Sequence, residues 1–227
     1  MIANIQKDLD KLRNPKKAKI LQRFFKTGPG EYGEGDIFLG IVVPEQRKIA
    51  KKYKDLGLKD IQELLNSKYH EHRLTGLIIL TYQYKNKPKE VYDFYIKNTK
   101  NINNWDLVDV TTPNIVGEYL LNKDRSILYK LAKSKDLWER RISILATFTF
   151  IRNSDFKDSI NLAEILLQDK HDLIHKAVGW MLREIGKKDQ KALETFLDKH
   201  HKIMPRTMLR YSIERLEKSK RKFYMKK

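Results

Sequence analysis

The chain has 227 residues, enough for one sizeable hydrophobic core and short for two independent domains. Its formal net charge of +18 favours polyanionic partners such as nucleic acids, although a lysine-rich solvated surface would give the same figure. The absence of cysteine excludes disulfides, thiolate zinc sites and cysteine nucleophiles.

No stretch of the sequence is apolar enough to predict a transmembrane helix. The N-terminal residues MIANIQKDLDKLRN carry acids and lack the apolar core of a signal peptide. Together with the lack of cysteine, this fits a protein of the reducing cytoplasm.

From the N-terminus, Asn14 before Pro15 has the pattern of a helix cap and first helical residue. The loop GPGEYGEGD (28–36) fits the glycine spacing of a dinucleotide-binding motif, but it follows no strand and carries acids that would repel a pyrophosphate. The run FLGIVV (38–43) has no partner strand elsewhere, so we predict helix or loop there, with Pro44 marking a new helix.

The rest of the chain has the apolar period of helices, with Asp189 after Gly186 as a further cap. The fold class predicted is therefore all-α. The longest apolar helical stretches are LTGLIILTYQY (74–84), WDLVDVTTPNIVGEYLL (105–121), WERRISILATFTFI (138–151) and IHKAVGWMLREIG (174–186).

Five helical segments share a charged residue followed by small or apolar residues in matching order. The charged positions are Arg73, Asp109, Arg141, Lys176 and Arg210, separated by 36, 32, 35 and 34 residues. This period is that of two-helix HEAT-like repeats, which stack so that equivalent positions form a row on one, usually concave, face. The alternative is an accidental alignment, which helical proteins also produce. If the row is real, it is a basic surface suited to duplex DNA.

Asp109 is the one acid in this row, and a carboxylate there would weaken simple phosphate binding. Trp105 lies one helical turn before it, Trp180 lies four residues after Lys176, and Trp138 lies three residues before Arg141. Indole faces attract cations and pack on sugars, and a carboxylate between them would stabilise an oxocarbenium-like sugar during glycosidic cleavage. The alternative is that each tryptophan belongs to the core.

The strings that carry these residues resemble signature segments of the AlkD family of bacterial DNA alkylation repair glycosylases, and the resemblance spans nearly the whole chain. The matching strings are NNWDLVD (103–109), LWERRISI (137–144), KAVGWMLRE (176–184), NPKKAKILQRFF (14–25) and FLGIVVPEQR (38–47).

The resemblance implies a solenoid of HEAT-like repeats with a basic concave face that excises 3-alkyladenine and 7-alkylguanine. It also implies that the lesion stays in the duplex rather than being flipped out. On the matching positions, Trp105, Asp109 and Trp180 would form the catalytic cleft, and Arg141 would contact DNA near the lesion. The carboxylate would stabilise the sugar cation and position the attacking water.

Two residues depart from the family pattern: Phe24 replaces a tyrosine, which removes a hydroxyl contact, and Asn104 replaces a second tryptophan. The GPGEYGEGD loop (28–36) is also longer and more acidic than its counterpart. These differences bear on fine specificity rather than on the catalytic residues. The residues that we predict to contact DNA are Arg141, Arg73, Lys176, Arg210, Phe24 and Arg140.

We predict one HEAT-like repeat domain over 1–217, followed by a basic tail, KSKRKFYMKK (218–227), which is either a disordered end or an additional DNA contact. His171 and His175 are spaced for a metal but lack a third ligand, so we expect no metal and no cofactor.

The predicted partner is duplex DNA that contains alkylated bases, bound by a monomer. The competing hypotheses are a non-catalytic repeat protein that binds damaged or branched DNA, and a protein-interaction scaffold, which the charge disfavours.

Overall fold

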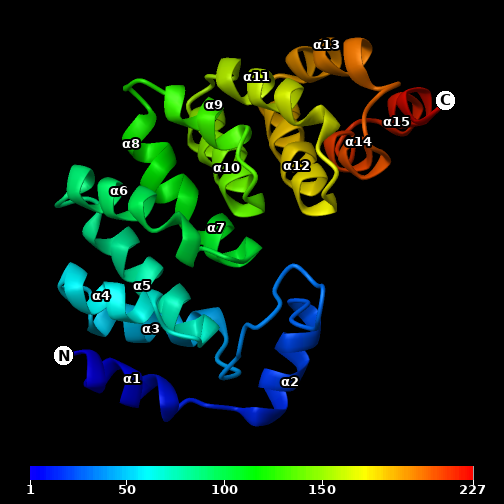
Figure 1. Cartoon of the computed structure of the whole chain (residues 1–227). Helices are drawn as coiled ribbons and strands as arrows, with labels where there is room; N and C mark the ends of the chain where they lie inside the picture. Colours follow the sequence, from blue (N-terminus) through cyan, green and yellow to red (C-terminus); the bar gives the residue numbers. More distant parts are fainter. Residues whose placement is uncertain (227) are drawn as a thin grey trace. The chain divides into compact units, whose positions relative to one another are not determined.

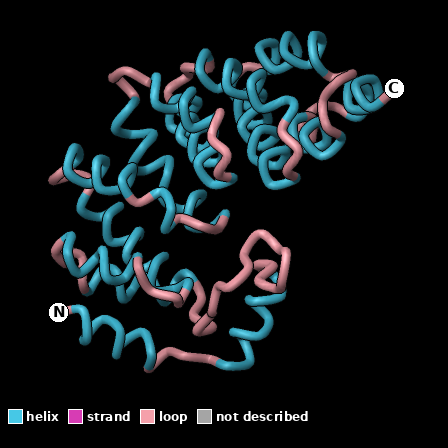
Figure 2. Tube along the Cα trace, in the orientation of Figure 1, coloured by secondary structure: helices cyan, strands magenta, loops and turns pink. Residues whose placement is uncertain are grey.

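The computed structural model describes residues 1–226, and in that range it consists of helices joined by loops (Figures 1 and 2). Within those residues the only β-type pairing is an isolated parallel bridge between Ile37 and Tyr69. The prediction of an all-α fold is confirmed. In the described residues no helix is long and apolar enough to span a membrane.

The chain forms two compact units, divided between Thr111 and Thr112. In the first unit, α5 packs against α3 and α4, and its buried leucines and isoleucines fill the core with those of α4. The helices of this unit are α1 (Ile2–Asp10), α2 (Pro15–Phe24), α3 (Val43–Lys52), α4 (Leu58–Leu65), α5 (His70–Gln83), α6 (Pro88–Lys97), the 3₁₀ turn η1 (Thr99–Asn101) and α7 (Trp105–Thr112).

The second unit is a series of helix pairs in which α10, α12 and α14 pack against one another in sequence order (Figure 1). Helices α9, α11 and α13 each pack against one or two members of that series. The elements are the π-helix η2 (Pro113–Gly117), α8 (Glu118–Leu120), α9 (Ser126–Ala132), α10 (Leu137–Arg152), α11 (Lys157–Ile165), the 3₁₀ turn η3 (Leu166–Gln168), α12 (Asp172–Lys188), α13 (Gln190–His200), α14 (Arg206–Ser212) and α15 (Lys218–Met225).

The helix boundaries follow the capping residues of the sequence. Asn14 accepts a hydrogen bond from the backbone N–H of Lys17 and caps α2, which begins at Pro15. Asp189 caps α13 by accepting from the N–H of Ala192. These predicted helix starts are confirmed.

The five aligned positions of the sequence repeat occupy matching places in their helices. Arg73 is the fourth residue of α5, and the other four positions are each the fifth residue of α7, α10, α12 or α14. The close packing of α12 against α14 depends on Gly179, because a Cβ there would lie 2.5 Å from the backbone oxygen of Met208. The repeat in the sequence therefore corresponds to a repeat of helices.

The predicted tail is a structured element. Residues 218–225 form α15, and its Tyr224 is buried, with the hydroxyl donating to Asp198 Oδ1 of α13 at 2.8 Å. Tyr224 therefore anchors this basic segment to the second unit, whereas Phe223 is 58% exposed. The prediction of a single domain over 1–217 remains a prediction.

The apolar run FLGIVV is a loop up to Val42, because its backbone groups bind a side chain instead of a strand. The buried carboxylate of Glu71 accepts hydrogen bonds from the N–H groups of Leu39, Gly40 and Ile41 at 2.8, 2.8 and 3.1 Å. Gly40 has a φ of +87°, and a Cβ there would lie 2.2 Å from the backbone oxygen of Asn14. This anchored loop holds α2 close to α5.

Replacing Glu71 with glutamine is expected to lower the free energy of unfolding by about 2 kcal/mol. The amide keeps the size of the side chain, but its NH₂ group faces backbone donors and leaves at least one of them unsatisfied. Chemical denaturation of the variant measures the loss. Glu63→Gln, at an exposed site of α4, is the matched control and should leave stability nearly unchanged; equal stabilities for both variants would contradict this role of Glu71.

Candidate active site

Helix α7 carries the acid and one of the tryptophans that the sequence analysis selected. Its first N–H, that of Trp105, donates to the side-chain oxygen of Asn104 at 2.9 Å. Trp105 and Asp109 lie four residues apart, hence one turn apart on one side of the helix, and both are partly exposed. The structure therefore brings a carboxylate and an indole together at an accessible position.

The indole of Trp105 ends a stack of aromatic rings. It lies parallel to Phe25, with 4.9 Å between ring centroids, and Phe25 stacks in turn on Phe38, also at 4.9 Å. The ring of His70 stacks on Phe38 at 4.3 Å. Phe24 contacts the indole edge-on at 5.9 Å while remaining 61% exposed. Because Phe25 covers one face of the indole, the position of Trp105 is set by the core of the first unit.

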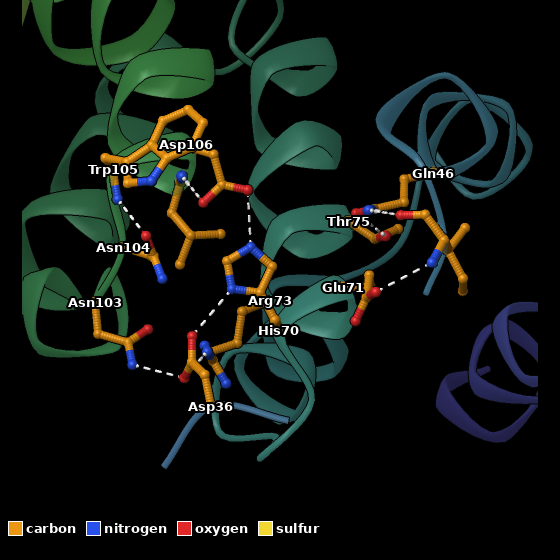
Figure 3. A network of polar contacts seen from close by, with 12 residues as sticks. Asp36, Gln46, His70, Glu71, Arg73, Thr75, Asn103, Asn104, Trp105 and Asp106 are labelled. Atoms are coloured by element: carbon orange, nitrogen blue, oxygen red, sulfur yellow. Dashed lines mark hydrogen bonds and ion pairs between the residues drawn. The ribbon is translucent and has the colours of Figure 1, made fainter. Parts of the chain in front are cut away.

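A buried polar network lies beside this stack (Figure 3). The imidazole of His70 lies between two carboxylates, with Nδ1 3.0 Å from Asp36 Oδ2 and Nε2 2.8 Å from Asp106 Oδ2. Asp36 also accepts from Arg73 at 2.5 Å and from Asn103 at 2.9 Å. The network joins the loop before α3, the first turn of α5 and the first turn of α7.

The charges of this network follow from its geometry. Burial by itself would lower the pKa of His70, but the adjacent carboxylates of Asp106 and Asp36 outweigh it and raise that pKa to about 9. Burial would likewise raise the pKa of Asp36, yet the hydrogen bond from His70 and the charge of Arg73 hold it below its usual value. At neutral pH, His70 is therefore an imidazolium that joins two carboxylates.

The two acids of α7 thus differ in environment. Asp106 is only 5% exposed and holds the start of the helix to His70, whereas Asp109 is partly exposed one turn later. The sequence analysis selected Asp109 and passed over Asp106. The string His70-Glu71-His72-Arg73 at the start of α5 was the local signal for a polar cluster, but nothing in the sequence pairs it with Asp36 and Asp106.

Three of the predicted DNA contacts make internal hydrogen bonds. Arg73 and Arg141 are each 5% exposed; Arg73 donates to the backbone oxygen of Ser67 as well as to Asp36, and Arg141 donates to the backbone oxygen of Leu173. The partly buried Arg140 pairs with Asp169 at 2.6 Å and donates to two backbone oxygens before α10. Arg73 and Arg141 are therefore buried positions of the predicted row, and Arg140 lies outside that row; contact of the three arginines with DNA stays a prediction.

The other predicted contacts are more accessible. Lys176 is partly exposed and pairs with Asp172 at 2.7 Å, while Arg210 and Phe24 are exposed. Trp180 is partly exposed, stacks at a tilt on Phe148 at 5.5 Å and donates from Nε1 to Glu184 at 3.2 Å. Trp105, Asp109 and Phe24 belong to the first unit, and Trp180, Lys176 and Arg210 belong to the second.

The two histidines that were considered as metal ligands make hydrogen bonds at the N-terminus of α12. His171 caps that helix by accepting from the N–H of Leu173 at 3.1 Å, and His175 bonds to the backbone oxygen of Asp169. Trp138, the remaining tryptophan, is 7% exposed and belongs to the core of the second unit. The interpretation of that indole as a core residue is confirmed.

The fold and α7 together define an all-helical, strongly basic protein that presents a carboxylate beside an indole. The family model described as DNA alkylation repair enzyme matches residues 5–216, and the chain belongs to that family. A solved structure described as a predicted DNA alkylation repair enzyme from Enterococcus faecalis superposes with a TM-score of 0.73 and 16% sequence identity, covering 91% of this chain and 97% of that one. This likeness shows the shared fold. A comparison with curated proteins gave no match.

Proposed function

We propose that this protein is a DNA glycosylase that hydrolyses the N-glycosidic bond of positively charged alkylated purines, 3-alkyladenine and 7-alkylguanine, in duplex DNA. The observation that carries the proposal is that the two acids of α7 lie in different environments. Asp106 anchors the helix inside the protein, and Asp109 remains accessible beside Trp105. A protein that only binds DNA gains nothing from an accessible carboxylate on the surface that meets phosphates.

The main contribution that this reaction requires from the protein is electrostatic. When the bond between C1′ and the purine nitrogen breaks, its electron pair leaves with the base and neutralises the positive charge of that base. No general acid is needed for a leaving group of this kind. The deoxyribose becomes an oxocarbenium-like cation, and water adds to C1′ and loses a proton. The Asp109 carboxylate stabilises the sugar cation and orients that water, and the Trp105 indole faces the same positive charge.

The size of this effect is set by distance and dielectric. Two opposite charges about 4 Å apart interact by about 4 kcal/mol when the effective dielectric constant is about 20. A stabilisation of that size, present only once the sugar is charged, corresponds to roughly a thousandfold in rate. The electrostatic contribution of one carboxylate is therefore large enough to support catalysis.

For DNA binding we retain Lys176, Arg210 and Phe24, whose side chains are at least partly exposed. Phe24 projects from α2 between Arg23 and Lys26, so an apolar ring and two cations are presented together. We propose that the protein works as a monomer built from HEAT-like repeats and that it leaves the lesion within the duplex. That last part rests on the sequence resemblance.

The proposal is tested with duplexes that carry a single lesion, either cationic 7-methylguanine or neutral hypoxanthine, in buffer that contains EDTA. We expect abasic sites, detected by alkaline strand cleavage, from the cationic lesion and none above background from the neutral one. If the protein binds both duplexes but forms abasic sites from neither, the alternative of a non-catalytic DNA-binding protein is correct.

Replacing Trp180 with alanine is expected to slow base release roughly tenfold, the scale of one cation–π contact in a desolvated site. Trp180→Phe keeps an aromatic face and should retain most of the rate. Single-turnover release measures both variants, and circular dichroism checks that α12 is intact. A rate equal to that of the parent in Trp180→Ala would remove this residue from the proposed site.

A further inference from the structure

A cationic pocket lies between α14 and the C-terminal helix α15. It has a volume of about 560 Å³ and is lined by Arg210, Ile213, Lys218, Arg221, Lys222 and Met225. Four of these six residues are cationic and none is acidic. The matched family region ends at residue 216, so α15 adds side chains beyond that region.

The helix that forms one wall of the pocket is held in place by contacts along its length. The buried Tyr224 donates to Asp198, Arg206 donates to the backbone oxygen of Met225 at 3.1 Å, and Lys220 pairs with Glu194 at 2.5 Å. Lys218, Arg221 and Lys222 are spaced i, i+3 and i+4 and therefore lie on one face of α15. The helix that carries three of the four cations is thus held against the second unit.

The cations of this pocket lack acidic partners within the part of the chain that the structure describes. None of Arg210, Lys218, Arg221 and Lys222 has a carboxylate oxygen within 4.0 Å, whereas Lys220, on the same helix, is paired with Glu194. All four are exposed. Cations gathered without counter-charges repel one another, and an anion in the pocket would relieve that repulsion.

We propose that this pocket binds a backbone phosphate of duplex DNA. The inference rests on the DNA-binding part of the proposed function and is independent of its catalytic part. Arginine and lysine are the side chains that most often hold DNA phosphates, and such contacts fix the position of a protein on the duplex without reading its sequence. Through Arg210 the pocket also extends the predicted row of DNA contacts onto α15.

The test compares two double variants that remove the same charge from the second unit. Arg221→Gln/Lys222→Gln alters the pocket, and Lys191→Gln/Lys202→Gln alters exposed residues that do not line it. Fluorescence anisotropy with an unmodified labelled duplex measures affinity over a range of salt concentrations. We expect the pocket variant to bind roughly tenfold more weakly, and its plot of log affinity against log salt to be shallower by about 1 to 2.

The control variant should change both quantities much less, and thermal melting should show that both variants fold. Equal binding by the two double variants would overturn the proposal. Calorimetric titration with inorganic phosphate tests whether the pocket binds free phosphate instead of a phosphate of the DNA backbone. Saturable phosphate binding that is lost in the pocket variant, with DNA binding unchanged, would identify a free-phosphate site and also overturn it.

The two proposals fail in distinguishable ways. If the parent protein forms no abasic sites but the pocket variant still shows the weaker and less salt-dependent binding, the glycosylase proposal is wrong and the phosphate site stands. If base release occurs and the pocket variant binds DNA like the control, the phosphate site is wrong and the catalytic proposal is untouched.

Discussion

Asp109→Asn is expected to lower the rate of base release by about two to three orders of magnitude while leaving DNA affinity unchanged or higher. Asparagine has the same shape and still accepts a hydrogen bond, so only the negative charge is lost. In the reaction that we propose, that charge stabilises the sugar cation in the transition state and repels the phosphates of the bound duplex. The rate is measured by single-turnover release from a duplex with one 7-methylguanine, and affinity by anisotropy on the same duplex.

Glu118→Gln is the matched control, because it removes one negative charge from an exposed position of α8. We expect its release rate to stay within about twofold of that of the parent, as is usual for exposed surface charges. An Asp109→Asn variant that releases the base as fast as the parent would show that this carboxylate takes no part in the reaction.

His70→Gln is expected to lower the free energy of unfolding by about 3 kcal/mol near pH 6. The imidazolium of His70 bonds two buried carboxylates, those of Asp36 and Asp106, and glutamine supplies no positive charge to either. Two acids would then remain inside the first unit, and Arg73 pairs with one of them, Asp36. Denaturant unfolding of parent and variant measures the difference, and His201→Gln, at a partly exposed site, is the control.

The same substitution predicts a pH dependence of definite sign. The pKa of His70 is raised from 6.5 to about 9 in the folded protein, so its stabilising contribution is complete below about pH 6.5. That contribution is lost as pH rises through 9, when the imidazole gives up its proton. The stability gap between parent and His70→Gln should therefore be widest at pH 6 and close by about 3 kcal/mol towards pH 10. A gap that widens with pH would contradict a protonated His70.

The network also links stability to catalysis. Asp106 is bound by His70 and lies between Trp105 and the turn that carries Asp109. Loss of the His70 bond would loosen the start of α7, and base release should fall in His70→Gln by more than DNA affinity does. We therefore propose that His70 is a positioning residue, which acts on the proposed reacting groups through α7.

The all-α class, the repeated helices and several helix starts could be predicted from the sequence because each depends on local patterns. Asn14 before Pro15 and Asp189 near a glycine are capping signals that act within a few residues. The charged positions spaced 32 to 36 residues apart fall at the fourth or fifth residue of five helices, and their HEAT-like repeat stays a prediction. The proximity of Asp109 and Trp105 could be predicted because residues four apart share a helix face.

The direction of long side chains could not be predicted in the same way. Arg73 and Arg141 occupy the same repeat position as Lys176 and Arg210, yet Arg73 donates to the backbone oxygen of Ser67 in the loop before α5, and Arg141 donates to that of Leu173 in the first turn of α12. A guanidinium satisfies several acceptors at once and tolerates such burial. Arg210 is nevertheless exposed, so the residue type does not decide the direction of the side chain. The sequence pattern therefore predicted the charges of the repeat positions and not which of them are exposed.

The buried network escaped sequence reasoning for a different reason. Asp36, His70 and Asp106 are separated by more than thirty residues at each step, and each type is common on surfaces. Only the packing of three segments shows that they meet. The C-terminal run illustrates the opposite case, because Phe223 and Tyr224 within KSKRKFYMKK were a local sign that this basic segment packs against the protein.

The central claim is that repair occurs by breaking the bond between sugar and base, and the fate of the methyl group tests it most directly. Duplex DNA methylated with a radiolabelled methyl group is incubated with the protein, and the released label is identified by chromatography and mass spectrometry. We predict that the label leaves as intact 7-methylguanine and 3-methyladenine, with one abasic site formed for each base released. Label that leaves without its purine ring, passes to the protein or stays in the DNA would contradict the account.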